Sequence, residues 1–222
     1  HNADRATPAL IERLNSGETV ALVSDAGTPL VSDPGYRLVN AALNSDIKVI
    51  PVPGASAPLA ALSVSGLPTD RFMFEGFLPN KSAARRKALE QAATVQATLV
   101  FFESAKRLAK SLADMADLLG NRDAVIAREI TKRFEEMTRG SLGSLAAQFE
   151  TAPAPKGEVT IVVGPPGETA APSEVEIDGL LQEALIRLSV KDAASAVASS
   201  TGLPRRPLYQ RALQLQSEDG VG

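Results

Sequence analysis

The sequence predicts an α/β protein of two α/β domains followed by a small helical unit. Two observations carry this prediction. Buried apolar runs alternate with amphipathic helical stretches over residues 1–164, which is typical of sheets built with crossover helices. A Gly- and Pro-rich segment, 164–173, comes next, and only helical patterns follow it.

Residues 1–69 are predicted to form the first domain. Helices and strands alternate in it, at Thr7–Asn15 (helix), Thr19–Ser24 (strand), Pro34–Leu43 (helix), Ile47–Val52 (strand) and Ala55–Ser65 (helix). Asp33 is predicted to cap the second helix, with Pro34 in its first turn. The alternation predicts a parallel sheet with crossover connections.

Residues 70–164 are predicted to form the second domain, which is richer in strand. The expected strands are Arg71–Leu78, Thr98–Phe102, Ala124–Arg128, Phe134–Arg139 and Val159–Val163, and the expected helices are Ser82–Ala92, Ser104–Leu119 (capped by Ser104) and Leu145–Glu150. Because strands follow one another closely here, we expect a mixed sheet.

Residues 165–174 are predicted to be a linker, and residues 175–216 a C-terminal helical unit. Its expected helices are Ile177–Leu188, Val190–Ser200 and Pro204–Leu215. Ser189 and Asp192 have the spacing of a helix cap, and Gly202 breaks the chain before the last helix. Two short helices joined by a Gly-containing turn resemble a helix-turn-helix unit.

Composition limits the chemistry. The 222-residue chain has no cysteine and one histidine, so we expect no disulfide, no thiolate nucleophile and no metal site. No apolar run reaches the length of a membrane span, and we expect a soluble cytoplasmic protein. The net charge is -3, so any nucleic-acid contact must come from local basic patches. The chain begins with His1 rather than Met, and we expect an N-terminal segment to be missing.

Two loops carry most of the functional information. The first, Ser24–Gly35, follows a predicted strand, and the second, Pro53–Ala57, follows the next one. Ligands of open α/β sheets bind at the carboxyl ends of strands, and small residues let a ligand approach the main chain. Either loop alone is better explained as an ordinary tight strand-to-helix turn, but the two in this order are much more specific.

Five longer runs carry a resemblance: ALVSDAGTPLVSDPGYRLV, VIPVPGASA, GLPTDRFMFEGFLP, LVFFES and AREITKRFEE. On these runs the chain resembles the tetrapyrrole (corrin/porphyrin) methylases. Within that superfamily it resembles the bacterial branch that methylates the 2'-hydroxyl of a cytidine ribose in small-subunit ribosomal RNA. The resemblance implies two α/β domains with S-adenosylmethionine in the cleft between them, a homodimer, and small-subunit RNA or the assembled small subunit as partner.

The resemblance also implies cofactor-binding positions. They are Ala26, Gly27, Thr28, Val31, Ser56, Ala57, Phe102, Glu103 and Ile130. Thr28 stands where the tetrapyrrole enzymes carry an acidic residue, which favours the RNA branch. Members of the family begin with a strand and loop that complete the cofactor site, and this chain lacks them.

Removal of a proton from a ribose hydroxyl needs a carboxylate or a lysine nearby. The candidates are Asp25, Glu103, Glu129 and Lys132. A structural interpretation stands beside each: Asp25 as a turn residue, Glu103 as a helix cap, and Glu129 with Lys132 as an exposed ion pair.

Local basic patches are the candidates for RNA contact, because lysine and arginine position nucleic acid through its phosphates. They are Lys81, Arg85, Arg86, Lys87, Arg205 and Arg206. A solvated helix face explains the 81–87 run equally well. Two other functions stay open beside RNA methylation: a tetrapyrrole C-methyltransferase, and a non-catalytic fragment that binds a nucleotide or RNA.

Overall fold

The computed structural model describes residues 3–167, 173–201 and 203–219. The chain divides into two compact units, residues 1–166 and 167–222, and each is described by itself. Part of the expected linker, 165–174, lies outside the described residues. Gly202 lies outside them too. The finer division of the first unit at residue 69 stays a prediction.

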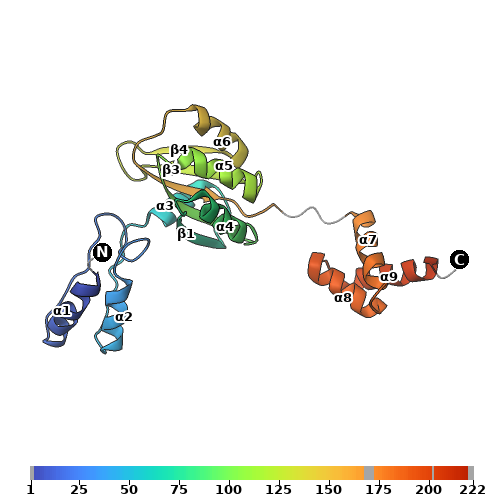
Figure 1. The fold of residues 1–222 in the computed structure, drawn as a ribbon, viewed down its shortest axis with the longest axis horizontal. Helices are drawn as coiled ribbons and strands as arrows, with labels where there is room; N and C mark the ends of the chain where they lie inside the picture. Colours follow the sequence, from blue (N-terminus) through green and yellow to red (C-terminus); the bar gives the residue numbers. More distant parts are fainter. Residues whose placement is uncertain (1–2, 168–172, 202, 220–222) are drawn as a thin grey trace. The chain divides into compact units, whose positions relative to one another are not determined.

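A mixed five-stranded sheet forms the centre of the first unit (Figure 1). Its strands are β1 (Phe72–Phe77), β2 (Thr98–Ser104), β3 (Asp123–Arg128), β4 (Glu136–Ser141) and β5 (Glu158–Val163), in the order β1-β2-β5-β3-β4. Only β1 and β2 are paired in parallel. The sequence predicted both the strands and the mixed sheet of this region.

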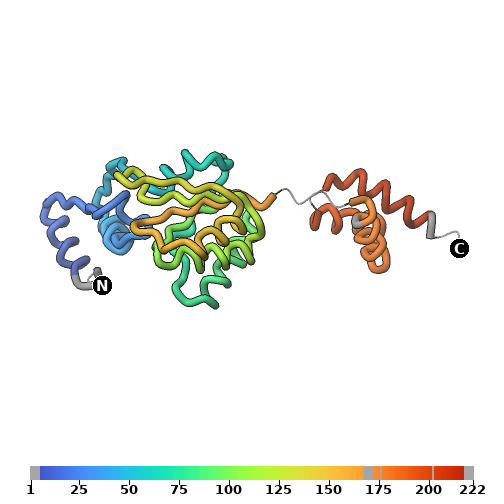
Figure 2. Tube along the Cα trace, turned by 90° about the horizontal axis from the view of Figure 1, so that it is seen from above, coloured from blue at the N-terminus to red at the C-terminus, as the bar shows by residue number. Residues whose placement is uncertain are grey.

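Side-chain alternation along the strands divides the core between two faces of the sheet. Helices α4 (Ser82–Ala93), α5 (Leu108–Leu119) and α6 (Leu142–Thr151) pack on the face that carries Leu99, Phe101 and Ile126. Helix α3 (Ala57–Ser65) packs on the other face, against Val100 and Val162 (Figures 1 and 2). Because neighbouring strand residues point to opposite faces, the three central strands β2, β3 and β5 contribute to both layers.

The two strands expected in the first 65 residues do not form, which corrects the prediction. Thr19–Ser24 and Ile47–Val52 run without any strand pairing among the described residues, between helices α1 (Ala3–Asn15), α2 (Tyr36–Asn44) and α3. A β-strand is stable only when a neighbour satisfies its backbone groups and covers its apolar face. The side chains of Val23 and Val52 are 81% and 85% exposed, so neither condition is met.

Two helix starts also differ from the expectation. Gly35, with a φ of 135°, precedes α2, so neither Asp33 nor Pro34 begins it. Ser104 is the last residue of β2, paired with Glu158, and a residue held in the ladder cannot cap a helix. Helix α5 therefore starts at Leu108, four residues later.

The second unit is a bundle of three helices, α7 (Glu174–Leu185), α8 (Val190–Thr201) and α9 (Arg205–Asp219). Its own apolar core is formed by Leu181, Ala194, Val197, Leu208, Ala212 and Leu215. Ser189 caps α8, since its hydroxyl accepts a hydrogen bond from the Asp192 amide at 3.2 Å and donates one to the Asp192 carboxylate at 2.7 Å. The predicted cap is confirmed.

Candidate functional site

One edge of the sheet brings the predicted cofactor positions together. Strands β2 and β3 both run antiparallel to β5, and β1 runs parallel to β2. The carboxyl ends of β1, β2 and β3 therefore lie at the same edge, which is where α/β sheets bind ligands. That edge carries Gly76, Phe102 and, just beyond β3, Ile130.

The loop Ser24–Gly35 reaches the same edge through Ser32. The Cβ that an alanine would place at Gly76 would lie 2.9 Å from the Ser32 hydroxyl oxygen. Gly76 sits at a register irregularity of β1, with a φ of 68°. A glycine is thus required twice over here, by the left-handed backbone and by the close approach of the loop.

A hydrogen bond joins the two predicted cofactor loops. The Thr28 hydroxyl donates to the Ala55 carbonyl at 2.9 Å, and a Cβ at Gly27 would meet that same carbonyl oxygen at 3.7 Å. Ala26, Gly27, Thr28 and Ala55 are all exposed. The side chains are small, so a ligand can reach the main chain of both loops.

The remaining predicted cofactor residues have defined places. Ser56 caps α3 through a 3.5 Å bond from the Leu59 amide, and Ala57 opens that helix. Phe102 is half-buried, with its ring centroid 5.0 Å from that of Phe74. Val31 is 42% exposed on the first loop. Phe102 and Val31 therefore leave apolar surface available to a ligand.

Ile130 lies in a turn held by ion pairs and by an unusual backbone. Glu129 and Thr131, on either side of it, have φ values of 49° and 63°, and left-handed conformations at residues other than glycine cluster at functional sites. The Glu129 carboxylate accepts hydrogen bonds at 2.9 Å from both the Glu158 amide and the Lys132 ammonium. These bonds present Ile130 in a fixed conformation.

Those bonds make Glu129 and Lys132 poor candidates for a base. The Glu158 amide and the Lys132 ammonium hold the pKa of Glu129 below its ordinary value. Hydrogen bonds to Glu158 and Glu129 raise the pKa of Lys132. A weaker carboxylate base and a more firmly protonated ammonium both oppose proton abstraction, so the structure favours the ion-pair interpretation of the two residues.

The prediction of Glu103 as a candidate base needs correction, because its carboxylate does not face the site. Its side chain is fully buried and accepts hydrogen bonds from the Ser111 hydroxyl at 2.5 Å, the Arg107 guanidinium at 3.1 Å and the Ser104 amide at 2.7 Å. These partners, which the sequence analysis did not connect to it, fasten α5 to the end of β2. We therefore assign Glu103 a structural role.

Asp25 is the candidate base that stays accessible. It is exposed in the first cofactor loop, next to Ala26, and the salt bridges found between described residues do not include it. Of the four candidates, Asp25 alone combines exposure with a carboxylate outside those pairs.

The prediction of Arg85 as an RNA contact also needs correction. Its side chain is 7% exposed and pairs with Asp114 at 2.6 Å, so the guanidinium cannot reach a phosphate without breaking a buried ion pair. Arg86 pairs with Asp114 and Asp117 at the surface. Lys81 and Lys87 are exposed and stay candidates for RNA contact.

Arg205 and Arg206 lie in the second unit and line a cavity of about 410 Å³ together with Lys191 and Tyr209. Both arginines are exposed at the start of α9. Lys191 could not be connected to this place from the sequence, because only the fold brings α8 beside α9.

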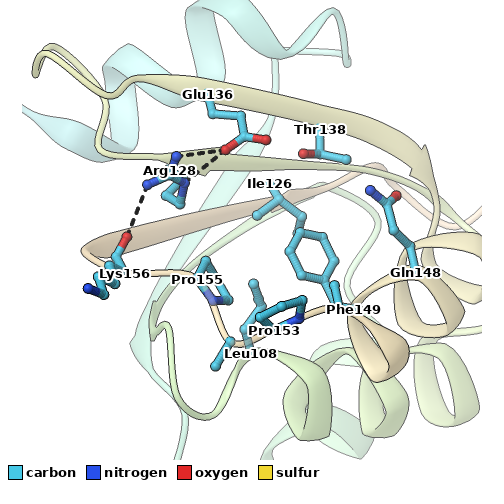
Figure 3. Close-up of a pocket in the computed structure, with 12 residues that line it drawn as sticks. Leu108, Ile126, Arg128, Glu136, Thr138, Gln148, Phe149, Pro153, Pro155 and Lys156 are labelled. Carbon is cyan, nitrogen blue, oxygen red and sulfur yellow. Dashed lines mark hydrogen bonds and ion pairs between the residues drawn. The ribbon is translucent and has the colours of Figure 1, made fainter.

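A second cavity, of about 480 Å³, lies in the first unit between the β3–β4 pair and the segment after α6 (Figure 3). Ile126, Phe149 and Pro153 give it an apolar lining. Arg128 also lines this cavity. Its guanidinium donates hydrogen bonds to the Glu136 carboxylate at 2.7 Å and to the Lys156 carbonyl at 3.1 Å. None of the predicted cofactor residues lines this cavity, so we do not place the cofactor there.

No helix in residues 3–167, 173–201 or 203–219 is long and apolar enough to cross a membrane. Over the same ranges no cluster of three or more histidine or acidic side chains has the arrangement of a metal site.

Comparison with family models gives two matches. The model for the tetrapyrrole (corrin/porphyrin) methylases matches residues 1–146. A model described as the RsmI C-terminal HTH domain matches residues 171–216.

Curated relatives named ribosomal RNA small subunit methyltransferase I match almost the whole chain. The protein of Mesorhizobium japonicum is 51% identical, and the match covers 100% of this chain and 76% of that protein. The protein of Pseudomonas aeruginosa is 45% identical over 98% of this chain and 79% of its own length. The Escherichia coli protein is 42% identical, with 97% and 76% covered.

Solved structures share the fold at low sequence identity. The methyltransferase CobJ matches with a TM-score of 0.56 and 24% identity, over 77% of this chain and 72% of that one. A diphthine synthase matches with a TM-score of 0.57 and 19% identity, over 73% of this chain and 66% of that one.

Proposed function

From the premise that this chain belongs to the tetrapyrrole (corrin/porphyrin) methylase family, and within it to the ribosomal RNA small subunit methyltransferase I proteins, we propose its reaction and substrate. The chain is a methyltransferase. It transfers a methyl group from S-adenosylmethionine to the 2'-hydroxyl of a cytidine ribose in small-subunit ribosomal RNA. The cytoplasm is the compartment that this substrate implies.

The observation that supports the proposal is that the first cofactor loop meets the carboxyl edge of the sheet and is bonded to the second loop. Thr28 ties the first loop to Ala55 of the second, and Ser32 lies against Gly76 of β1. Ala26, Gly27, Thr28, Val31, Ser56, Ala57, Phe102 and Ile130 are the residues that would hold the cofactor. S-adenosylmethionine, when bound, supplies a methyl group activated by its sulfonium sulfur.

This chain's part in the reaction is mainly to orient the reactants. Transfer of a methyl group to an oxygen needs an in-line approach, and fixing that geometry supplies most of the acceleration. The bonded loops and the turn around Ile130 provide fixed contacts for it. We propose Asp25 as the group that accepts the proton of the ribose hydroxyl, since it is an exposed carboxylate in the first cofactor loop.

The tetrapyrrole alternative is less well supported. The relatives named for ribosomal RNA are 41–51% identical to this chain, whereas CobJ is 24% identical and shows the fold alone. The helical unit at residues 171–216 matches a domain model of the ribosomal RNA branch. Thr28 departs from the acidic residue that the resemblance implies for tetrapyrrole enzymes.

A homodimer is part of the proposal. Large apolar side chains are exposed in the segments Thr19–Ser24 and Ile47–Val52, which have no strand partner among the described residues. Ile50 is 68% exposed and Val52 is 85% exposed. Exposed apolar surface of this kind marks an interface. Light scattering should give twice the chain mass, and Ile50→Asp should lower it; a monomeric wild-type chain would contradict this part.

Two measurements test the reaction. Calorimetric titration with S-adenosylmethionine should show binding, and unmethylated small subunits incubated with labelled cofactor should gain label in their RNA. Asp25→Asn should lower kcat by about 100-fold or more without weakening cofactor binding. The matched control Asp46→Asn changes another exposed aspartate and should leave kcat unchanged. Absence of label from the RNA would overturn the proposed substrate. Absence of cofactor binding, both by this chain and by a longer version that begins with the strand and loop expected of the family, would overturn the proposed enzyme activity.

A further inference from the structure

The second unit contains a basic hollow that the proposed methylation site does not use. Lys191, Arg205, Arg206 and Tyr209 line it, and its volume is about 410 Å³. Lys191 is in the first turn of α8, and the two arginines are in the first turn of α9. The Arg205 guanidinium lies 3.4 Å from the Lys191 carbonyl oxygen, so the starts of the two helices meet here.

The three cations are available to a ligand. All are exposed, and the ion pairs found between described residues include none of them. Arg211, on the same helix, is different, because it pairs with Asp178 at 2.6 Å and joins α9 to α7. None of the described residues that line the hollow is a carboxylate, so these residues attract anions.

Tyr209 adds an aromatic surface to this charge. Its side chain is 39% exposed, while its neighbour Leu208 is buried in the core of the helical unit. The ring therefore sits at the wall of the hollow on a helix that the core holds in place. Lysine and arginine beside an exposed aromatic ring is the combination that binds single-stranded nucleic acid, through phosphates and base stacking.

We propose that this basic hollow binds an unpaired segment of RNA, with phosphates at Lys191, Arg205 and Arg206 and one base stacked on Tyr209. RNA as the partner rests on the proposed function. In helix-turn-helix units the start of the second helix contacts nucleic acid, and α9 is that helix. The major groove of an RNA duplex is too narrow and deep for such contacts, so an unpaired segment fits better.

The test measures binding of the full chain to a fluorescent single-stranded oligoribonucleotide of about ten nucleotides, without cofactor. Lys191→Ala, Arg205→Ala and Arg206→Ala should each weaken binding and lower the slope of log affinity against log salt by about 0.7. Tyr209→Ala should weaken binding by about fivefold or more, whereas Tyr209→Phe keeps the ring and should bind like wild type. Arg187→Ala is the matched control, an exposed arginine outside the lining.

Three outcomes would overturn the inference. A duplex of the same sequence could bind as tightly as the single strand. Arg187→Ala could weaken binding as much as Arg206→Ala, or Tyr209→Ala could bind like wild type. Methylation of small subunits separates this inference from the proposed function. If the chain binds the oligoribonucleotide through these residues but transfers no methyl group to RNA, only the proposed function fails. If it methylates RNA and the hollow variants keep the wild-type KM and oligoribonucleotide affinity, only this inference fails.

Discussion

The Thr28 hydroxyl donates a 2.9 Å hydrogen bond to the Ala55 carbonyl, across 27 positions of sequence. This bond links the loop after one extended segment to the loop after the next. It gives Thr28 a role in the shape of the site besides any contact with a ligand.

Thr28→Val should therefore weaken S-adenosylmethionine binding by about three- to tenfold, since one hydrogen bond contributes about 0.5–1.5 kcal/mol and valine matches threonine in shape. Thr28→Ser keeps the hydroxyl and should bind within about twofold of wild type. Calorimetric titration measures both. Equal affinity of the valine variant and wild type would show that the bond does not organise the loops.

Gly76→Ala should weaken cofactor binding because its new Cβ would displace Ser32 and the first loop with it. The control is Gly66→Ala. Gly66 has a φ of 77°, against 68° for Gly76, and a ψ of 8°. No neighbouring atom lies within 4 Å of an added Cβ there. Both variants should lose about 1 kcal/mol of stability from backbone strain, but only Gly76→Ala should lose affinity in the titration. A loss of affinity in both would trace the effect to stability alone.

Arg85→Ala should lower the free energy of unfolding by about 1.5–3 kcal/mol, the contribution of hydrogen bonds to a charged group, because Asp114 would keep only its more exposed partner Arg86. Lys87→Ala, an exposed change on the same helix, should stay within about 0.5 kcal/mol of wild type. Urea unfolding measures both. If Arg85→Ala is as stable as wild type yet binds RNA more weakly, the structural assignment of Arg85 is wrong.

Glu103→Gln should destabilise the fold rather than abolish catalysis. A neutral amide bonds Arg107 and Ser111 less strongly than the carboxylate does, and hydrogen bonds to charged groups contribute about 1.5–3 kcal/mol. Well below the unfolding temperature, kcat should stay near the wild-type value. A large fall in kcat without loss of thermal stability would return Glu103 to the list of candidate bases.

Glu129 should make stability depend on pH in the acid range. Its pKa is held below the ordinary value of 4.5 in the folded chain, so between the two pKa values the unfolded state binds more protons. The stabilisation is complete above the unfolded pKa of 4.5 and is lost as pH falls through the folded pKa. Glu129→Gln should flatten this part of the curve of stability against pH. Parallel curves for variant and wild type would contradict the prediction.

Much of the second half of the first unit could be predicted from sequence. Thr98–Phe102 and Val159–Val163 are apolar on both faces, which is the pattern of central strands, and both lie in the middle of the sheet. The same reasoning was wrong for Thr19–Ser24 and Ile47–Val52. Their composition is that of strands, but pairing depends on a neighbour, and a local pattern cannot supply one.

The sequence by itself determined the family and the order of the helices and strands after residue 70, because these depend on local composition and on long matching runs. Only the tertiary structure decided what individual charged residues do. Glu103 and Arg85 have the residue types of a base and a phosphate contact, yet their partners Ser111 and Asp114 make them structural. Lys191 was raised to a candidate contact in the same way, by a helix packed beside it. Exposure and partners come from folding, since they depend on residues distant in sequence.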